Sequence, residues 1–181
     1  MGLKIAWGIT GAGDMIEENI SFMKDLIKKY DLDVHVFISK EGEVVLKFYK
    51  LLDEVKNNFV KVSIEKGPNS PFLAGRLQTG AYDLFLISPA TANTVAKIAS
   101  CIADSLITNS AAQAMKVNLP VFILPVDLKE GKLVTKLPNG KEIVVRVRKE
   151  DAAMVEKLRI MEGITVLSSL AEIEDVIKRF I

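Results

Sequence analysis

The chain has 181 residues, of which 49% are apolar and 26% are charged, and its formal net charge is +1. This length predicts a single domain over residues 1–181 that buries a core without disulfides or metals. The near-neutral charge argues against a nucleic-acid partner. One cysteine and one histidine exclude an internal disulfide and a histidine-based metal site. No long apolar run and no leader pattern are present, which predicts a soluble protein of the cytoplasm that is not bound to a membrane.

Short apolar segments alternate with segments of helical periodicity, which is typical of β-α units on a parallel sheet. Strands are expected at residues 3–9, 34–39, 60–64, 84–88, 121–124 and 165–167. Helices are expected after an N-cap at Asp14, over 43–55, over 71–79, within the stretch from 89 to about 116, over 149–161 and over 170–180. This order predicts an α/β fold with helices on both faces of the sheet.

A different pattern follows the fifth expected strand. Residues 132–137 and 141–147 alternate in polarity around Asn139-Gly140, and Asn-Gly is the strongest short signal for a β-hairpin. Residues 128–149 carry seven basic and two acidic side chains, a net charge of +5 in a chain of +1. We expect a hairpin excursion of the one domain. Its charge either steers an acidic protein partner or only protects the edges of an exposed hairpin.

A glycine-rich turn separates the first strand from the first helix. The spacing of Gly8, Gly11 and Gly13 fits neither the dinucleotide fingerprint nor the Walker A motif. Backbone N–H groups in such a turn can still bind a phosphate. At the end of the second strand, where a dinucleotide site usually has an acid, Ser39 and Lys40 supply a hydroxyl and a cation. The turn indicates either a mononucleotide phosphate site or a tight turn that only needs glycine.

Small and hydroxylated residues follow the fourth strand, at the edge where open parallel sheets bind ligands. Ser88, Thr91, Asn93 and Thr94 supply hydrogen-bonding groups, and alanines between them let a flat ligand approach the backbone. Asn93 or Thr94 is also expected to cap the next helix. Asp104 is expected either to cap a helix or to meet a ligand or a neighbouring subunit.

Three further side chains attract attention because of their chemistry. Cys101 is expected to be a small packed residue, since free cysteine is among the most buried residue types, and a redox-active thiol is the alternative. His35 lies in a strand-like segment and is interpreted as structural. Trp7 is expected in the core of the first strand.

The segment from Pro89-Ala-Thr-Ala-Asn-Thr to Ile102-Ala-Asp-Ser-Leu-Ile-Thr108 resembles the homo-oligomeric flavin-containing cysteine decarboxylase superfamily. Gly8-Ile-Thr-Gly-Ala12 and Ile38-Ser39-Lys40 are similar to the flavin-phosphate segments of its prenyltransferase branch. The resemblance implies a flavodoxin-like fold and an FMN cofactor, often at a trimer interface of a homo-oligomer. The cofactor-binding residues that it implies are Thr10, Gly11, Ala12, Gly13, Ser39, Ser88, Pro89, Ala90, Thr91, Asn93, Thr94, Ala103 and Asp104.

The decarboxylases of this superfamily carry a histidine before the fourth strand and a Pro-x-Met-Asn motif after the fifth. In this chain, residues 71–83 contain no histidine. After the fifth expected strand, Pro125-Val-Asp127 stands in place of the Pro-x-Met-Asn motif. Leu124-Pro-Val-Asp-Leu-Lys-Glu-Gly131 and Leu137-Pro-Asn-Gly140 instead resemble the archaeoflavoprotein and dihydromethanopterin reductase branch. Some members of that branch hold iron–sulfur clusters through several cysteines, which one cysteine cannot do.

This resemblance implies an FMN-dependent oxidoreductase. We hypothesise that it takes electrons from a ferredoxin-like donor, which the basic hairpin would attract, and passes them to a pterin or another small-molecule acceptor. A flavin-dependent decarboxylase or prenyltransferase and a non-catalytic flavin-binding subunit are the alternatives. No catalytic side chain is assigned by the sequence, because the candidate site contains neither a histidine nor paired carboxylates. The flavin would have to carry the reaction.

Overall fold

Six parallel strands form the central sheet of the protein, whose computed structural model describes residues 2–181. The strand order is β3-β2-β1-β4-β5-β8. Their bounds are Leu3–Ile9 for β1, Leu32–Ile38 for β2, Lys61–Ile64 for β3, Leu84–Ala90 for β4, Val121–Pro125 for β5 and Ile164–Val166 for β8. The predicted α/β fold of the flavodoxin-like type is confirmed, and every predicted strand is present within a few residues.

The central strands are apolar along their whole length because both faces of the sheet are covered. Every residue of β4 and β5 is buried. Trp7 of β1 is completely buried and its ring meets that of Phe59 edge to face, which confirms its predicted place in the core.

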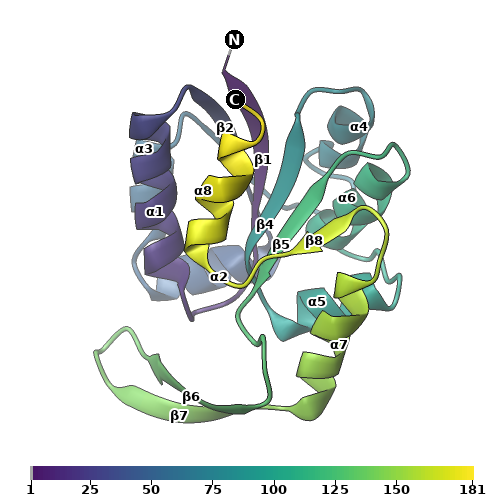
Figure 1. Ribbon diagram of the computed structural model, residues 1–181. Helices are drawn as coiled ribbons and strands as arrows, with labels where there is room; N and C mark the ends of the chain where they lie inside the picture. The colour runs from purple at the N-terminus through teal and green to yellow at the C-terminus, as the bar shows by residue number, and fades with distance from the viewer. Residues whose placement is uncertain (1) are drawn as a thin grey trace.

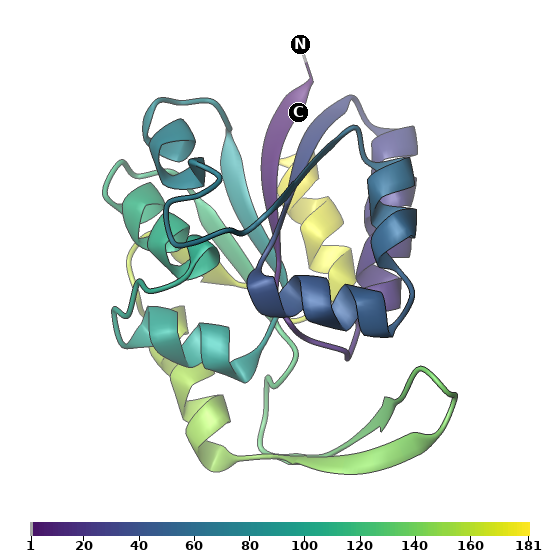
Figure 2. The ribbon, with the colours of Figure 1, turned by 180° about the vertical axis from the view of Figure 1, so that it is seen from behind.

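Helices cover the two faces of the sheet, as Figures 1 and 2 show. One face packs against α1 (Ile16–Lys29), α3 (Leu52–Asn58) and α8 (Leu170–Lys178). The other packs against α4 (Leu73–Gln78), α5 (Ala92–Ala99), α6 (Leu106–Met115) and α7 (Lys149–Arg159). Helix α2 (Lys40–Phe48) lies at the carboxyl edge of the sheet. The site described below lies at this edge.

Two expectations about helices were wrong. The predicted helix over residues 43–55 is divided into α2 and α3, because Lys50 between them adopts a left-handed backbone with φ 60°. Asp14 does not cap α1: Met15 holds that position with φ 59°, and no side chain caps the helix there. The Asn19 side chain donates to the Met15 carbonyl oxygen at 2.7 Å, which holds this unusual start of the helix.

The predictions for the single cysteine and the single histidine had opposite outcomes. Cys101 is exposed and has a left-handed backbone with φ 58°, so its predicted burial was wrong. It follows the last turn of α5 and points out of the core. His35 is structural as predicted: it is buried, stacks on Phe37, and its ring nitrogens lie 2.8 Å from the hydroxyls of Tyr82 and Ser63.

The predicted hairpin is formed by β6 (Gly131–Lys136) and β7 (Glu142–Val147), which pair antiparallel as a separate sheet. It lies beyond the carboxyl edge of the main sheet, at the opposite end from the termini (Figure 1). The Tyr49 hydroxyl donates to the Lys136 carbonyl oxygen at 3.2 Å, and the Thr135 hydroxyl lies 3.5 Å from Asp14. Within residues 2–181, no helix is long and apolar enough to cross a membrane. The cytoplasmic location remains a prediction.

Candidate functional site

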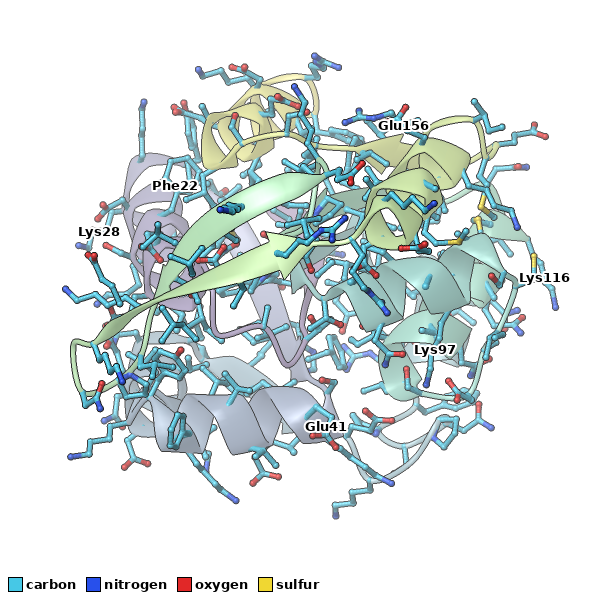
Figure 3. All side chains as sticks on the ribbon, turned by 90° about the horizontal axis from the view of Figure 1, so that it is seen from below. Phe22, Lys28, Glu41, Lys97, Lys116 and Glu156 are labelled. Atoms are coloured by element: carbon cyan, nitrogen blue, oxygen red, sulfur yellow. The ribbon has the colours of Figure 1, made fainter. Side chains whose placement is uncertain are left out.

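The strand order reverses between β1 and β4, since β2 and β3 lie on one side of this pair and β5 and β8 on the other. The loops that leave β1 and β4 therefore diverge and open a crevice at the carboxyl ends of the strands. A cavity of about 400 Å³ lies there, within the range of small-molecule sites. It is lined by Gly11, Ser39, Lys40, Glu41, Glu65, Pro68, Thr91, Asn93, Thr94, Lys97, Asp104, Ser105 and Ile107. Figure 3 shows two sides of this region, marked by Glu41 of α2 and Lys97 of α5, beside the hairpin.

The end of β4 and the loop that follows it are fastened to the end of β1 by a buried hydroxyl. Thr10 is 2% exposed; its Oγ1 donates to the Pro89 carbonyl oxygen at 2.7 Å and accepts the Thr91 N–H at 2.9 Å. The Trp7 indole N–H donates to the Ser88 carbonyl oxygen at 2.6 Å, and the Ser88 hydroxyl donates to Asn19. These bonds satisfy the polar groups beneath the loop and fix the wall of the cavity.

Two glycines in the turn after β1 are required by close packing. A Cβ on Gly11 would lie 2.8 Å from the Glu41 Cβ and 3.1 Å from its carbonyl carbon, so glycine lets the start of α2 approach the turn. A Cβ on Gly13 would lie 2.6 Å from the Tyr49 hydroxyl. The N–H groups of Gly11, Ala12 and Gly13 have no acceptor within residues 2–181. Gly11 lines the cavity, and unpaired N–H groups in a turn of this kind suit an anion.

The neighbouring helix starts supply further donors. The Ser39 hydroxyl caps α2 by accepting the Gly42 N–H at 2.9 Å and keeps its own proton for donation. Lys40 is exposed at the rim of the cavity and adds a cation. Helix α5 is capped by Thr91, whose hydroxyl accepts the Thr94 N–H, and not by Asn93 or Thr94 as expected. The Asn93 side chain is exposed at the cavity.

Asp104 forms an ion pair across the outer rim of the cavity. Its carboxylate oxygens lie 3.0 and 2.8 Å from Lys97 Nζ, and this hydrogen bonding lowers the pKa of the Asp104 carboxyl. Asp104 is not a helix cap, because Ser105 caps α6 in a reciprocal arrangement with Thr108. Of the two expectations for Asp104, a place beside a ligand site is the one that this position supports.

Two half-buried carboxyls lie near the base of the hairpin, where the loops leave β1 and β5. Burial raises the pKa of Asp14, and Glu18 raises it further. Burial also raises the pKa of Asp127, and the negative charges of Asp151 and Asp14 raise it further. Asp127 therefore holds a proton more readily than an exposed aspartate.

The structure divides the predicted cofactor residues into three groups. The cavity brings together Gly11, Ser39, Thr91, Asn93, Thr94 and Asp104. A second group is buried beneath or beside its wall, namely Thr10, Ala12, Ser88, Pro89 and Ala90, while Gly13 packs toward Tyr49. Ala103 instead lines another cavity, of about 560 Å³, together with Cys101. We place the site at the smaller cavity because it lies at the carboxyl ends of the strands.

The sequence did not single out Glu65, Lys97 or Ser105, which also line the cavity. Glu65 directly follows the third strand, so the rule that ligands bind beyond strand ends would have indicated it. Lys97 and Ser105 lie within the segment that carried the family resemblance, where no individual role was assigned to them.

Comparison with known proteins decides the family. A model described as Flavoprotein matches residues 1–180. The chain belongs to the Flavoprotein family. This match confirms the predicted membership of the homo-oligomeric flavin-containing cysteine decarboxylase superfamily.

The chain is 52% identical to Uncharacterized protein MJ0730 of Methanocaldococcus jannaschii, over 99% of this chain and 96% of that protein. It is 35% identical to a dihydromethanopterin reductase (acceptor) of the same organism, over 96% of this chain and 95% of the relative. Among solved structures, Burkholderia xenovorans DmrB in complex with FMN, a cubic protein cage for redox transfer, has a TM-score of 0.83 and 32% identity. That match covers 99% of this chain and 95% of DmrB.

The residues around the cavity fit a flavin mononucleotide. The unpaired N–H groups of Gly11, Ala12 and Gly13, with the Ser39 hydroxyl and the Lys40 ammonium, form a donor set for a phosphate. Asn93 and the hydroxylated residues at the start of α5 line the same cavity and can bond a sugar chain or the edge of a ring. Within residues 2–181 there is no group of histidine, cysteine and acidic side chains that would hold a metal ion.

Proposed function

We propose that the chain is an FMN-dependent oxidoreductase. The observation that carries this proposal is the cavity at the point where the strand order reverses, where unpaired N–H groups and a cation meet polar side chains of α5. The similarity of the chain to DmrB, which was crystallised with FMN, and to a dihydromethanopterin reductase supports the same conclusion.

Each wall of the cavity has a separate task in this proposal. The turn from Gly11 to Gly13 and the hydroxyl of Ser39 bind the phosphate, and Lys40 balances its charge. Thr91 and Asn93 lie beside the ring, and the buried Thr10 holds their loop in place without touching the cavity. Bound FMN supplies electron transfer in single or paired steps, and the protein supplies binding and orientation.

A reductase fits the residues of the site better than a decarboxylase does. The single histidine is His35, which is buried between Tyr82 and Ser63 and takes no part in lining the cavity. The segment before β4 contains no histidine, and Pro125-Val-Asp-Leu128 stands where the decarboxylases have the Pro-x-Met-Asn motif. For the electron acceptor we propose a dihydropterin, as the name of the 35% identical relative indicates.

The outer face of the hairpin suits a protein electron donor. Val134 and Val144 pair across it and are 57% and 65% exposed. On the same face, Lys132 and Arg146 form the pair that precedes the two valines along β6, and Lys136 lies two residues beyond Val134. With a net charge of +5 over residues 128–149, this surface would attract an acidic carrier such as a ferredoxin.

We also propose a homo-oligomer built on trimers, since DmrB forms a cubic cage. The cavity around Cys101 and Ala103, beside the 47% exposed Ile102, gives this chain an apolar surface that a second copy can cover. Light scattering on the purified protein gives the mass of the particle. A monomer at micromolar concentration contradicts this part of the proposal.

The test of the proposed function is anaerobic reduction of the FMN-loaded protein by different donors. We expect a reduced ferredoxin to bleach the flavin absorbance much faster than NADH or NADPH does, and a dihydropterin to restore it. Bleaching by none of these donors would favour a non-catalytic flavin-binding subunit. Release of carbon dioxide from a cysteine-containing substrate would favour the decarboxylase alternative.

A further inference from the structure

Glu65 is a buried carboxylate in the wall of the cavity. It follows β3 and is 7% exposed. Its Oε2 accepts the Lys40 N–H at 3.0 Å, and its Oε1 accepts the Leu106 N–H at 2.8 Å. These N–H groups belong to the first residues of α2 and α6. One side chain thus joins the amino-terminal ends of two helices that form different walls of the same cavity.

This arrangement offsets the cost of burying a charge. A buried carboxylate is strongly unfavourable unless hydrogen bonds and nearby positive charge compensate for it. Here each oxygen has an N–H donor, and the amino-terminal ends of α2 and α6 each carry a partial positive charge. The first N–H group of each of these two helices is therefore already occupied.

We infer that Glu65 is a positioning residue that directs the phosphate of FMN to the turn after β1. Because Glu65 accepts the first N–H of both helices, the phosphate is left to other unpaired N–H groups, among them those of Gly11, Ala12 and Gly13 in the turn after β1. Glu65 also fixes the start of α2, from which Ser39 and Lys40 face the cavity. This inference rests on the proposed function.

The connection after β3 is tied to α6 at a second point. The Asn109 side chain donates to the Pro68 carbonyl oxygen at 3.0 Å and to Asn69 Oδ1 at 2.9 Å. We expect these bonds to keep the connection on α6 when Glu65 is changed. The effect of a substitution should therefore appear mainly at α2, where the phosphate groups lie.

The test compares the affinities for FMN and for riboflavin, which lacks the phosphate. Binding is followed through the fluorescence of Trp7, the one tryptophan of the chain, which lies beneath the loop after β4. We expect E65A to weaken FMN binding at least tenfold and riboflavin binding less than threefold. E65Q, which keeps one acceptor oxygen, should lie between the wild type and E65A.

The variant E156Q, which removes an exposed carboxylate on α7, is the charge control and should bind both flavins as the wild type does. If E65A or E65Q lowers the affinities for FMN and riboflavin by the same factor, Glu65 only stabilises the fold, and the inference is overturned. Tighter FMN binding in either variant would overturn it too, since Glu65 would then only repel the phosphate. If E65A does not fold, the same comparison of the FMN and riboflavin affinities is made with E65Q. A wild-type chain that binds neither flavin would overturn the proposed function itself.

Discussion

Thr10 and Thr91 join the two loops that enclose the candidate site: the Thr91 N–H, just after β4, donates to the Thr10 hydroxyl, just after β1, at 2.9 Å. The same hydroxyl donates to the Pro89 carbonyl oxygen at 2.7 Å. Family resemblance implied that Thr10 holds the phosphate of a flavin. Its side chain instead has two protein partners and is buried, so we propose that it acts by fixing the loop.

Replacing Thr10 by valine keeps the shape of the side chain and removes both hydrogen bonds. Because a buried N–H group loses its partner, we expect T10V to lower the free energy of unfolding by about 1–3 kcal/mol. Urea titration measures this change, and FMN affinity should fall with it. T10S, which retains the hydroxyl, is the control. A T10V protein as stable as T10S would show that these bonds do not hold the loop.

The two glycines of the turn should differ in their response to alanine. A Cβ at Gly11 would meet the Cβ and the backbone of Glu41, whereas one at Gly13 would meet the ring and hydroxyl of Tyr49. We expect G11A to displace the start of α2 and reduce FMN affinity at least tenfold. G13A should mainly shift Tyr49 away from Lys136 and speed proteolysis of the hairpin. Equal effects of the two variants on FMN affinity would contradict this assignment.

Charge reversal on the hairpin tests the docking surface. We expect K132E/K136E to slow reduction by an acidic ferredoxin at least tenfold at low ionic strength and to weaken its salt dependence. The matched control K56E/K157E changes the net charge equally at exposed lysines of α3 and α7. If both double variants slow the reaction to the same extent, the hairpin has no special role in docking.

Much of the fold could be predicted because its determinants are local. The apolar segments of β1, β4 and β5 are continuous, and Asn139-Gly140 marks the hairpin turn. The division of the helix after Ser39 was missed because it depends on the left-handed backbone of Lys50, which is not a glycine. The burial of Cys101 was predicted from its residue type, whereas its position after α5 places it at the surface.

The site was predictable in location and less so in its individual contacts. Strand ends and small residues indicated the loop after β4, but Ser88 and Ala90 are fully buried. Local spacing does not show that β4 continues to Ala90. The sequence alone therefore does not separate the buried residues of the strand from those that line the cavity. Glu65 was missed because its two partners, Lys40 and Leu106, are 25 and 41 residues away along the chain.

His35 should make the stability of the protein depend on pH. Burial and the charge of Arg76 lower its pKa to about 4, below the value near 6.5 of an unfolded chain. The unfolded state therefore binds more protons between these values, so stability falls as the pH drops from 6.5 to 4. We expect His35 to contribute about 1–3 kcal/mol to this loss. Urea unfolding of the wild type and H35Q over this range measures it, and identical pH dependence in both would contradict the assignment.

The most direct measurement is a crystal structure of the chain grown with excess FMN. We predict a flavin at the carboxyl edge of the sheet, its phosphate bound by the backbone from Gly11 to Gly13 and by Ser39, and its ring beside Thr91 and Asn93. A cavity closed by protein side chains, or FMN bound only elsewhere on the molecule, would contradict this assignment and the redox function that depends on it.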